Sequence, residues 1–210
     1  DIHKSAIIDK YATIGSNVSI GAYTVIEGNV KIADNNVIKS SVYISGNTEI
    51  GPGNTFYPFC SIGSPPQDLK YDNEISYLKI GSNNTFREHT TVNPGTKGGG
   101  GLTKVGDNSL FMMGVHIAHD CIVGDNIVMA NQATLGGHVI VESKAIIGGL
   151  SGIHQFCRIG SLSMIGGLSS VDSDVVPFGL VSGNRAKLQG LNIVGLRRAS
   201  YSNEKILELK

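Results

Sequence analysis

Four of the six histidines of this chain lie between residues 116 and 154, and a carboxylate directly follows one of them. The four are His116, His119, His138 and His154, and the carboxylate is Asp120. Imidazole titrates near neutral pH and is the commonest general base in enzymes, and an adjacent carboxylate can orient it. The same residue types also ligate metal ions. The cluster by itself therefore indicates either acid–base chemistry or a metal site.

An apolar residue recurs at every sixth position along most of the chain. Three unbroken runs, over 2–62, 80–92 and 105–171, contain 26 such positions, and the next residue is very often glycine. A period of six fits neither a helix nor a simple half-buried strand. It fits a short strand followed by a tight turn, so that three hexads close one triangular coil whose strands pair in parallel with the next coil. The sequence predicts a parallel β-helix.

The coil of three hexads converts spacing along the chain into position on the prism. His138 follows His119 by one coil and one further residue, and His154 lies one residue short of two coils from His119. We expect these three imidazoles along nearly the same edge, with Asp120 one coil below His138. Parallel strands lie ~4.8 Å apart, so the imidazoles would be within reach of one substrate. A single histidine at a turn is usually a surface group, but three on one edge favour a site.

Proline and glycine clusters mark two interruptions of the repeat. These segments, 64–79 and 93–104, are predicted to be external loops, and loops of this kind often carry function. The β-helix is predicted over 1–177, because the hexads stop after Pro177. The remainder, 178–210, is predicted to begin a C-terminal helical region, with a cap near Ser202, that continues beyond Lys210.

Bulk composition argues against several functional classes. The formal net charge is +0, which disfavours a nucleic-acid binder with a broad basic face. No apolar run approaches the ~18 residues of a membrane span. Three cysteines without a CxxC pair indicate reduced thiols. We expect a cytoplasmic protein with no nucleic-acid partner and no integral membrane segment.

Five sequence blocks occur in an order that resembles the UDP-N-acetylglucosamine acyltransferase family of hexapeptide-repeat transferases. They are QDLKY (67–71), GVHIAHDCIVGD (114–125), LGGHV (135–139), IHQF (153–156) and GLNIVGLRR (190–198). The resemblance covers essentially the whole chain. It implies an all-β, left-handed parallel β-helix of hexapeptide repeats followed by a C-terminal α-helical region, assembled as a homotrimer in a Gram-negative bacterium.

The resemblance also implies a reaction, which is the first step of lipid A biosynthesis. A 3-hydroxyacyl group would pass from acyl carrier protein, a co-substrate, to the 3-hydroxyl of UDP-N-acetylglucosamine. His119 matches the general base, Asp120 would orient it, and the Gly137 N–H matches the group that stabilises the oxyanion. No cofactor is implied.

Other residues match the family's substrate contacts. Asp68 and Lys70 would reach substrate from a neighbouring subunit, and Arg198 would contact the diphosphate, where a guanidinium suits phosphate geometry. A small residue at Gly167 implies a long hydrocarbon groove and a long 3-hydroxyacyl donor. Ala199 departs from the family, which often has a second arginine there. The remaining implied contacts are His116, His138, His154, Gln155 and Asn192.

Three alternatives stay open at this point. One is another hexapeptide-repeat acyltransferase or acetyltransferase that acts on a nucleotide sugar, and another is a structural β-helix without catalysis. The third is a metal-dependent hydratase of the gamma carbonic anhydrase type, whose histidine pair is typically five residues apart. His116 and His119 are three apart with no thiol among them, so we predict no metal site.

Overall fold

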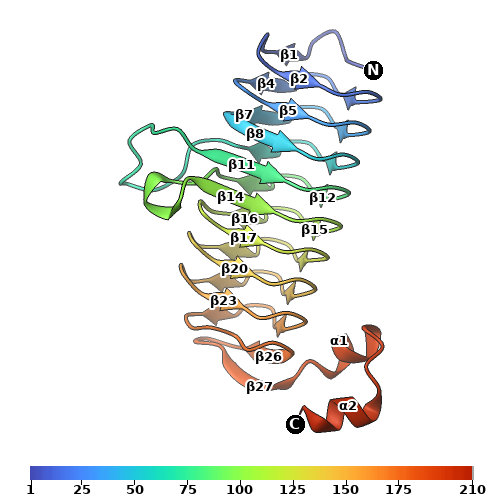
Figure 1. Ribbon diagram of the computed structural model, residues 1–210, viewed down its shortest axis with the longest axis vertical. Coiled ribbons are helices and arrows are strands. Elements are labelled where there is room, and N and C mark those ends of the chain that lie inside the picture. Colours follow the sequence, from blue (N-terminus) through green and yellow to red (C-terminus); the bar gives the residue numbers. More distant parts are fainter. Residues whose placement is uncertain (210) are drawn as a thin grey trace.

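The computed structural model describes residues 1–209, which form a column of stacked triangular coils (Figure 1). Each side of the column is a sheet of short strands. The first sheet contains β1 (Ile7–Ile8), β4 (Val25–Glu27), β7 (Tyr43–Ser45), β10 (Ser61–Ile62), β13 (Thr91–Val92), β16 (His116–Ile117), β19 (Thr134–Leu135), β22 (Gly152–Ile153) and β25 (Ser170–Val171). The second contains β2 (Thr13–Ile14), β5 (Lys31–Ile32), β8 (Asn47–Ile50), β11 (Tyr77–Ile80), β14 (Leu102–Val105), β17 (Ile122–Val123), β20 (Ile140–Val141) and β23 (Arg158–Ile159). The third contains β3 (Ser19–Ile20), β6 (Val37–Ile38), β9 (Thr55–Phe56), β12 (Thr85–Phe86), β15 (Leu110–Phe111), β18 (Val128–Met129), β21 (Ile146–Ile147), β24 (Met164–Ile165), β26 (Gly179–Ser182) and β27 (Lys187–Leu191).

The predicted coil length is confirmed by the strand register. From β1 to β22, each strand pairs in parallel with the third strand further along the chain, and Ile7 lies opposite Val25, three hexads further on. Where a loop intervenes, the register lengthens but the pairing continues, as between Ser61 and Thr91. The loops therefore leave the column without disturbing its stacking.

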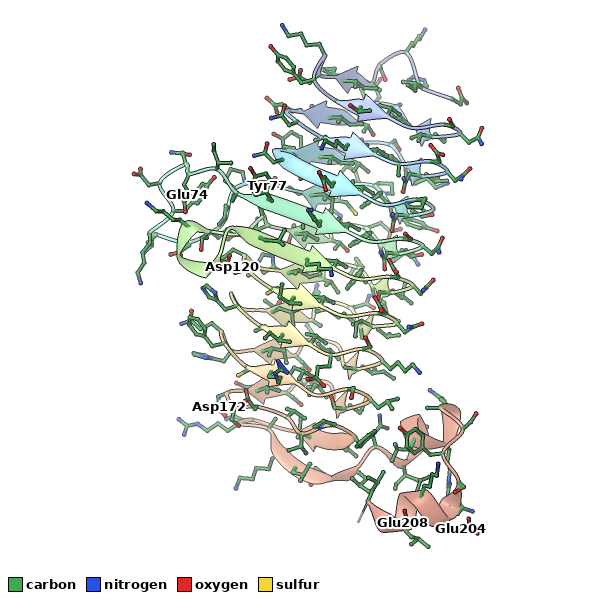
Figure 2. The ribbon with its side chains drawn as sticks, in the orientation of Figure 1. Glu74, Tyr77, Asp120, Asp172, Glu204 and Glu208 are labelled. Carbon is green, nitrogen blue, oxygen red and sulfur yellow. The ribbon has the colours of Figure 1, made fainter. Side chains whose placement is uncertain are left out.

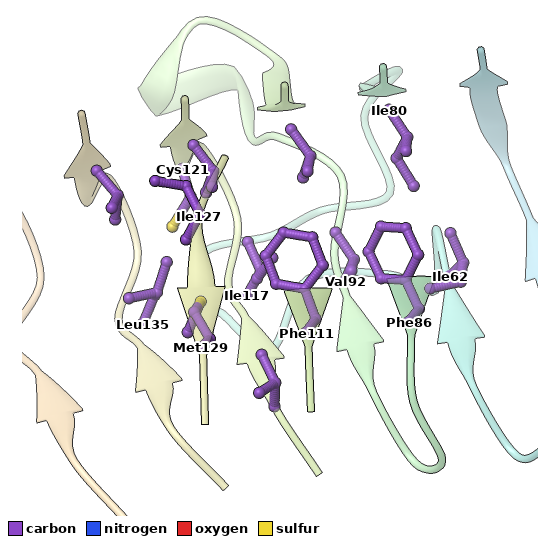
Figure 3. Close-up of a cluster of buried hydrophobic side chains, with 14 of the residues drawn as sticks. Ile62, Ile80, Phe86, Val92, Phe111, Ile117, Cys121, Ile127, Met129 and Leu135 are labelled. Carbon is purple, nitrogen blue, oxygen red and sulfur yellow. The ribbon is translucent and has the colours of Figure 1, made fainter. Parts of the chain in front are cut away.

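The hexad residues form the core of the column. From Ile20 onward every one of them is buried, whereas Ile2 is 50% exposed because no coil covers the first one. Three phenylalanine rings stack inside at successive coils, Phe56 on Phe86 and Phe86 on Phe111, each with ring centroids 4.8 Å apart. Figure 3 shows the rings of Phe86 and Phe111. Full burial of such a side chain stabilises the fold by about 1.5–3 kcal/mol.

A second inward position, two residues before each hexad residue, is not evident from the apolar repeat. It holds either apolar residues, such as Val30, Cys121 and Ile127, or polar residues, several of which bind backbone groups. Asn54 Oδ1 accepts the N–H of Asn84, and Asn84 Oδ1 accepts the N–H of Ser109, each at 2.9 Å. This asparagine ladder satisfies backbone groups that the tight corners leave unpaired.

Both loops are shorter than predicted. Strand β11 begins at Tyr77, so the first loop spans 63–76, and β14 begins at Leu102, so the second spans 93–101 and contains the short 3-10 helix η1 (Lys97–Gly99). Residues 77–79 and 102–104 pair as parallel strands, because the alternation of exposed and buried side chains starts before the next hexad residue.

The C-terminal region also differs from the prediction. The coil continues past Pro177, since β26 pairs in parallel with β24, and β27 then turns back antiparallel to β26. Only afterwards come α1 (Ile193–Arg198) and α2 (Asn203–Glu208). The predicted cap is confirmed, because the Ser202 side chain accepts the N–H of Lys205. Lys210, the last residue of the predicted helical region, lies outside the described residues. Within 1–209, neither helix has the length and apolar character needed to span a bilayer.

Candidate active site

A groove of about 940 Å³ opens on the first sheet, on the side of the column from which both loops project. Its floor consists of outward-facing side chains of β16, β19, β22 and β25. One wall consists of the turns that follow these strands, and the other is the first loop, at 67–70. Figure 2 shows Glu74, Asp120 and Asp172 on this side of the column, and Glu204 and Glu208 on the other.

A histidine–carboxylate pair lies in the turn after β16. His119 Nδ1 is 2.8 Å from Asp120 Oδ2, and the Asp120 side chain is only 1% exposed. Two further donors reach this carboxylate from the second loop: the Thr96 N–H to Oδ1 at 2.9 Å and the Thr96 hydroxyl to Oδ2 at 2.6 Å. Since a carboxylate only accepts, the His119 proton lies on Nδ1. This leaves Nε2 as a proton acceptor on the groove side.

Gly137 lies directly above His119, one coil on. A Cβ at Gly137 would be 2.5 Å from Cε1 and 2.6 Å from Nε2 of the imidazole, so only glycine leaves room for the ring. The same hexad position elsewhere accepts larger residues, including Ser16 and Ser82. The requirement for glycine therefore comes from His119 and not from the turn.

The Gly137 N–H is free to bind a ligand. At the equivalent turns, the Ser16 and Ser82 amides donate to the carboxylates of Asp34 and Asp107, at 2.7 and 2.6 Å. The Gly137 amide donates to none of residues 1–209. An unpaired N–H beside a general base is the arrangement that stabilises a developing oxyanion.

His138 lies one coil above Asp120, as predicted. Its ring lies edge-on to the ring of His119, with ring centroids 5.1 Å apart. It also stacks on the ring of Phe156, with centroids 4.4 Å apart. Asp120, His138 and Phe156 occupy the same corner on successive coils, each with a positive φ of 59°, 63° and 68°. His138 Nδ1 is 3.9 Å from Asp120 Oδ2, which is too far for a hydrogen bond.

Two more predicted histidines line the groove. His116 Nδ1 lies 2.7 Å from the Thr91 hydroxyl. Burial, with a smaller contribution from His119, lowers the pKa of His116, so it stays neutral at pH 7 and acts as a hydrogen-bonding group. His154 is exposed, with Nδ1 3.1 Å from the Gln155 carbonyl oxygen.

The geometry also bears on the metal alternative. One ligand atom from each of His119, Asp120 and His138 lies within 4.8 Å of the others. Both carboxylate oxygens of Asp120 are already bound by Thr96 and His119, and two imidazoles alone fall short of the three or four protein ligands of zinc sites. The arrangement suits acid–base chemistry better than metal binding.

Asp68 and Lys70 line the groove of their own chain, as Gln155 does. The first loop lies against the histidine groove of its own column. The implied contact of these two residues with the site of a neighbouring subunit stays a prediction. Asp120 is held behind His119. One chain thus brings together the predicted catalytic residues and most of the predicted substrate contacts.

Three predicted residues lie elsewhere in the chain. Asn192 is buried at the start of α1, where its side chain accepts the Gly195 N–H and donates to the Leu162 carbonyl. Arg198 ends the same helix, which lies across the column from the loops (Figure 1). Gly167 is exposed at the turn after β24 and does not line the groove.

Two site residues escaped prediction for different reasons. Phe156 follows His138 by three hexads, so the coil period could have placed it over that imidazole. Thr96 lies in a loop outside the period, and no spacing in the sequence connects it with Asp120.

This fold and this site define a hexapeptide-repeat acyltransferase. The chain matches the bacterial transferase hexapeptide (six repeats) family over residues 11–46 and 102–137. It matches domain 2 of the UDP N-acetylglucosamine O-acyltransferases over 174–210.

Relatives that match over the whole of this chain show the same family. The chain is 53% identical to the acyl-[acyl-carrier-protein]–UDP-N-acetylglucosamine O-acyltransferase of Aliarcobacter butzleri, over 100% of this chain and 81% of that protein. It is 45% identical to the same enzyme of Herminiimonas arsenicoxydans, over 100% and 80%. The crystal structure of UDP-N-acetylglucosamine O-acyltransferase from Moraxella catarrhalis superimposes with a TM-score of 0.97 at 47% identity, covering 99% of this chain and 81% of that one. The chain belongs to the acyl-[acyl-carrier-protein]–UDP-N-acetylglucosamine O-acyltransferase family.

Proposed function

We infer that this chain transfers a 3-hydroxyacyl group from acyl carrier protein to the 3-hydroxyl of UDP-N-acetylglucosamine, the first step of lipid A biosynthesis. Its relatives are named as O-acyltransferases that act on acyl-[acyl-carrier-protein] and UDP-N-acetylglucosamine. The observation that carries the inference is the His119–Asp120 pair beside the free Gly137 amide, in a groove large enough for a nucleotide sugar.

The pair supports a direct transfer without a covalent enzyme intermediate, because a thioester is already activated. His119 Nε2 takes the proton of the sugar hydroxyl as its oxygen attacks the thioester carbonyl carbon. The carbonyl oxygen becomes negative and accepts the Gly137 N–H, while Asp120 stabilises the imidazolium. When the tetrahedral intermediate collapses, the C–S bond breaks and the imidazolium returns its proton to the leaving thiolate. His119 is then neutral again, and the products are the acylated nucleotide sugar and the free thiol of the carrier protein.

The other groove residues act as substrate contacts in this proposal. His116, His138 and Gln155 face the groove from three successive coils and supply donors for sugar and acyl hydroxyl groups. Asp68 and Lys70 close the groove from the first loop, and His154 also lines it. A chain with these contacts holds the reacting atoms together, which by itself accelerates a bimolecular reaction.

A cyclic trimer would complete the site. Outward-facing apolar side chains form a continuous column on the third sheet: Leu110, Val128, Ile146, Met164 and Leu180. Leu150 and Leu168, 58% and 74% exposed, mark the corner between the third and first sheets. If the first sheet of one subunit faces the third sheet of the next, both features are covered, and α1 of the neighbour brings Asn192 and Arg198 towards the groove.

Mixed trimers test this assembly. His119→Ala and Arg198→Ala are expected to be nearly inactive alone, because one lacks the base and the other a diphosphate contact. Co-refolded, they regain activity if Arg198 of one subunit serves His119 of another, since some sites then have both residues intact. Mixtures no more active than their parents, or a monomeric mass by light scattering, contradict the trimer.

The activity itself is tested with purified components. We expect transfer from 3-hydroxyacyl carrier protein to UDP-N-acetylglucosamine, and a loss of about 10²–10⁴-fold in His119→Ala. Transfer from acetyl-coenzyme A in place of the carrier protein would favour the acetyltransferase alternative. Gly167 implies preference for a long acyl donor, and much faster turnover of a short 3-hydroxyacyl donor would contradict it.

The setting proposed for this reaction is the cytoplasm of a Gram-negative bacterium. Support comes from the cysteines, because Cys60, Cys121 and Cys157 are all free and buried. Burial raises the pKa of Cys60 and of Cys121 to about 12, so these thiols stay protonated and inert.

A further inference from the structure

The second loop presses directly on the catalytic carboxylate. Thr96, 5% exposed, binds both oxygens of Asp120, with its N–H on Oδ1 and its hydroxyl on Oδ2. Gly99 of the same loop packs so closely that a Cβ there would overlap the Asp120 carboxylate. Asp120 Oδ2 therefore accepts two donors at once, the Thr96 hydroxyl and His119 Nδ1.

We propose that Thr96 is a positioning residue for acyl transfer, which sets the orientation of the Asp120 carboxylate and through it the tautomer and ring orientation of His119. The inference rests on the proposed function of the groove. Thr96 itself touches no reacting atom, since Asp120 lies between it and the imidazole.

The need for such a residue follows from the second imidazole beside Asp120. His138 Nδ1 is 3.9 Å from the same Oδ2 that His119 binds at 2.8 Å. A modest rotation of the carboxylate would bring Oδ2 towards His138 and away from His119. Two donors from one residue, at 2.9 and 2.6 Å, resist this rotation because a carboxylate held at both oxygens cannot turn without losing one of them.

Thr96 is itself held by its loop. Its carbonyl oxygen accepts the N–H groups of Gly99 and Gly101, at 3.0 and 2.8 Å. Lys97, the next residue, donates its N–H to Glu74 Oε1 at 3.0 Å, which ties this loop to the one that carries Asp68 and Lys70. A preorganised support of this kind is what a general base requires from the residues behind it.

The test compares Thr96→Val, which keeps the shape and the N–H but removes the hydroxyl, with Thr96→Ser, which keeps the hydroxyl. In Thr96→Val, kcat is expected to fall about 10- to 100-fold, the value of one charge-assisted hydrogen bond, with KM for UDP-N-acetylglucosamine within about threefold. Thr96→Ser is expected to return kcat to within about threefold of the original chain.

A pH profile separates positioning from a general structural role. With one donor fewer, the carboxylate attracts the His119 proton more strongly, so the acidic limb of kcat/KM in Thr96→Val moves to higher pH. The other titratable groups that line this groove are all unchanged: His116 on the same coil as His119, His138 and His154 on the two coils above, Asp172 after β25, and Asp68 and Lys70 on the first loop. Thr103→Val is the matched control. Its hydroxyl accepts the Asp120 backbone N–H at 2.7 Å, so the variant loses stability but leaves the limb in place.

A double-mutant cycle with Asp120→Asn tests whether Thr96 acts through the carboxylate. If Thr96 acts through Asp120, Thr96→Val adds less than twofold to the loss in Asp120→Asn, measured on chain that elutes like the original. Full additivity overturns the proposal, as does a Thr96→Val enzyme with kcat within twofold of the original, or one whose limb stays in place. No transfer by the unmodified chain would overturn the proposed function instead.

Discussion

The Gly137→Ala substitution tests whether the position of His119 determines the rate. The added Cβ would be 2.5 Å from His119 Cε1 and 2.6 Å from Nε2. Carbon atoms in contact need ~3.5–4.0 Å, so the ring has to move by about 1 Å or swing out of its hydrogen bond with Asp120. The backbone tolerates a side chain at this position, and the amide that we assign to the oxyanion is retained.

The expected loss follows from that displacement. A misplacement of about 1 Å in a catalytic group costs roughly 10²-fold in rate, or about 2.7 kcal/mol of activation free energy. We expect the loss in kcat, with little change in KM for UDP-N-acetylglucosamine, because the contacts of His116 and Gln155 are not displaced. Steady-state rates with purified 3-hydroxyacyl carrier protein measure both parameters.

Gly149→Ala provides the matched control. Gly149 occupies the same hexad position two hexads on, and a Cβ there comes no closer than 3.1 Å to another group, the Asn131 carbonyl oxygen. Its kcat is expected to stay within about threefold of the original. The reasoning is refuted if Gly137→Ala keeps more than a third of kcat, or if Gly149→Ala loses as much as Gly137→Ala.

Three further predictions concern the column and its loops. Phe86→Ala removes the middle ring of the buried stack and is expected to cost about 3–5 kcal/mol in chemical denaturation, and a loss below about 1 kcal/mol would contradict its place in the core. Asn84→Ala leaves the Ser109 N–H without its acceptor and is expected to cost about 1–3 kcal/mol in the same assay, against little change if water replaces the side chain. The backbone N–H of Lys97 is the main cause that lowers the pKa of Glu74 below its usual value of 4.5, so the link between the loops is present above pH 4.5 and is lost as pH falls through the folded pKa. Hydrogen exchange at Lys97 should therefore lose its protection in acid, and Glu74→Gln should lack this pH dependence.

Much of the fold could be predicted because the β-helix is a local repeat. Each hexad specifies one strand and one turn, so the period alone places Ile117 in the core and His138 one coil above Asp120. The loop ends were harder to predict, because residues such as Tyr77 and Leu102 extend their strands beyond the hexad through pairing with the previous coil. The third sheet also continues past Pro177, where β26 pairs with β24 although no hexad marks it.

The candidate site likewise contains residues that the repeat places and residues that it does not. Residues on the coil, such as His119, His138 and Gln155, have positions that follow from counting in steps of three hexads, and the groove contains all three. The turn that brings Asn192 to the start of α1, away from the groove, follows no repeat and had no signal in the spacing.

What the sequence by itself determined about this protein is therefore its repeat, its core and the order of the catalytic side chains along one edge. These follow from short-range rules, since each coil rests only on its neighbours. Only the tertiary structure decided that Thr96 holds Asp120 and that the first loop covers its own groove. Those contacts join segments separated by irregular loops, and loop conformation depends on the particular hydrogen bonds that each backbone group finds when the chain is folded.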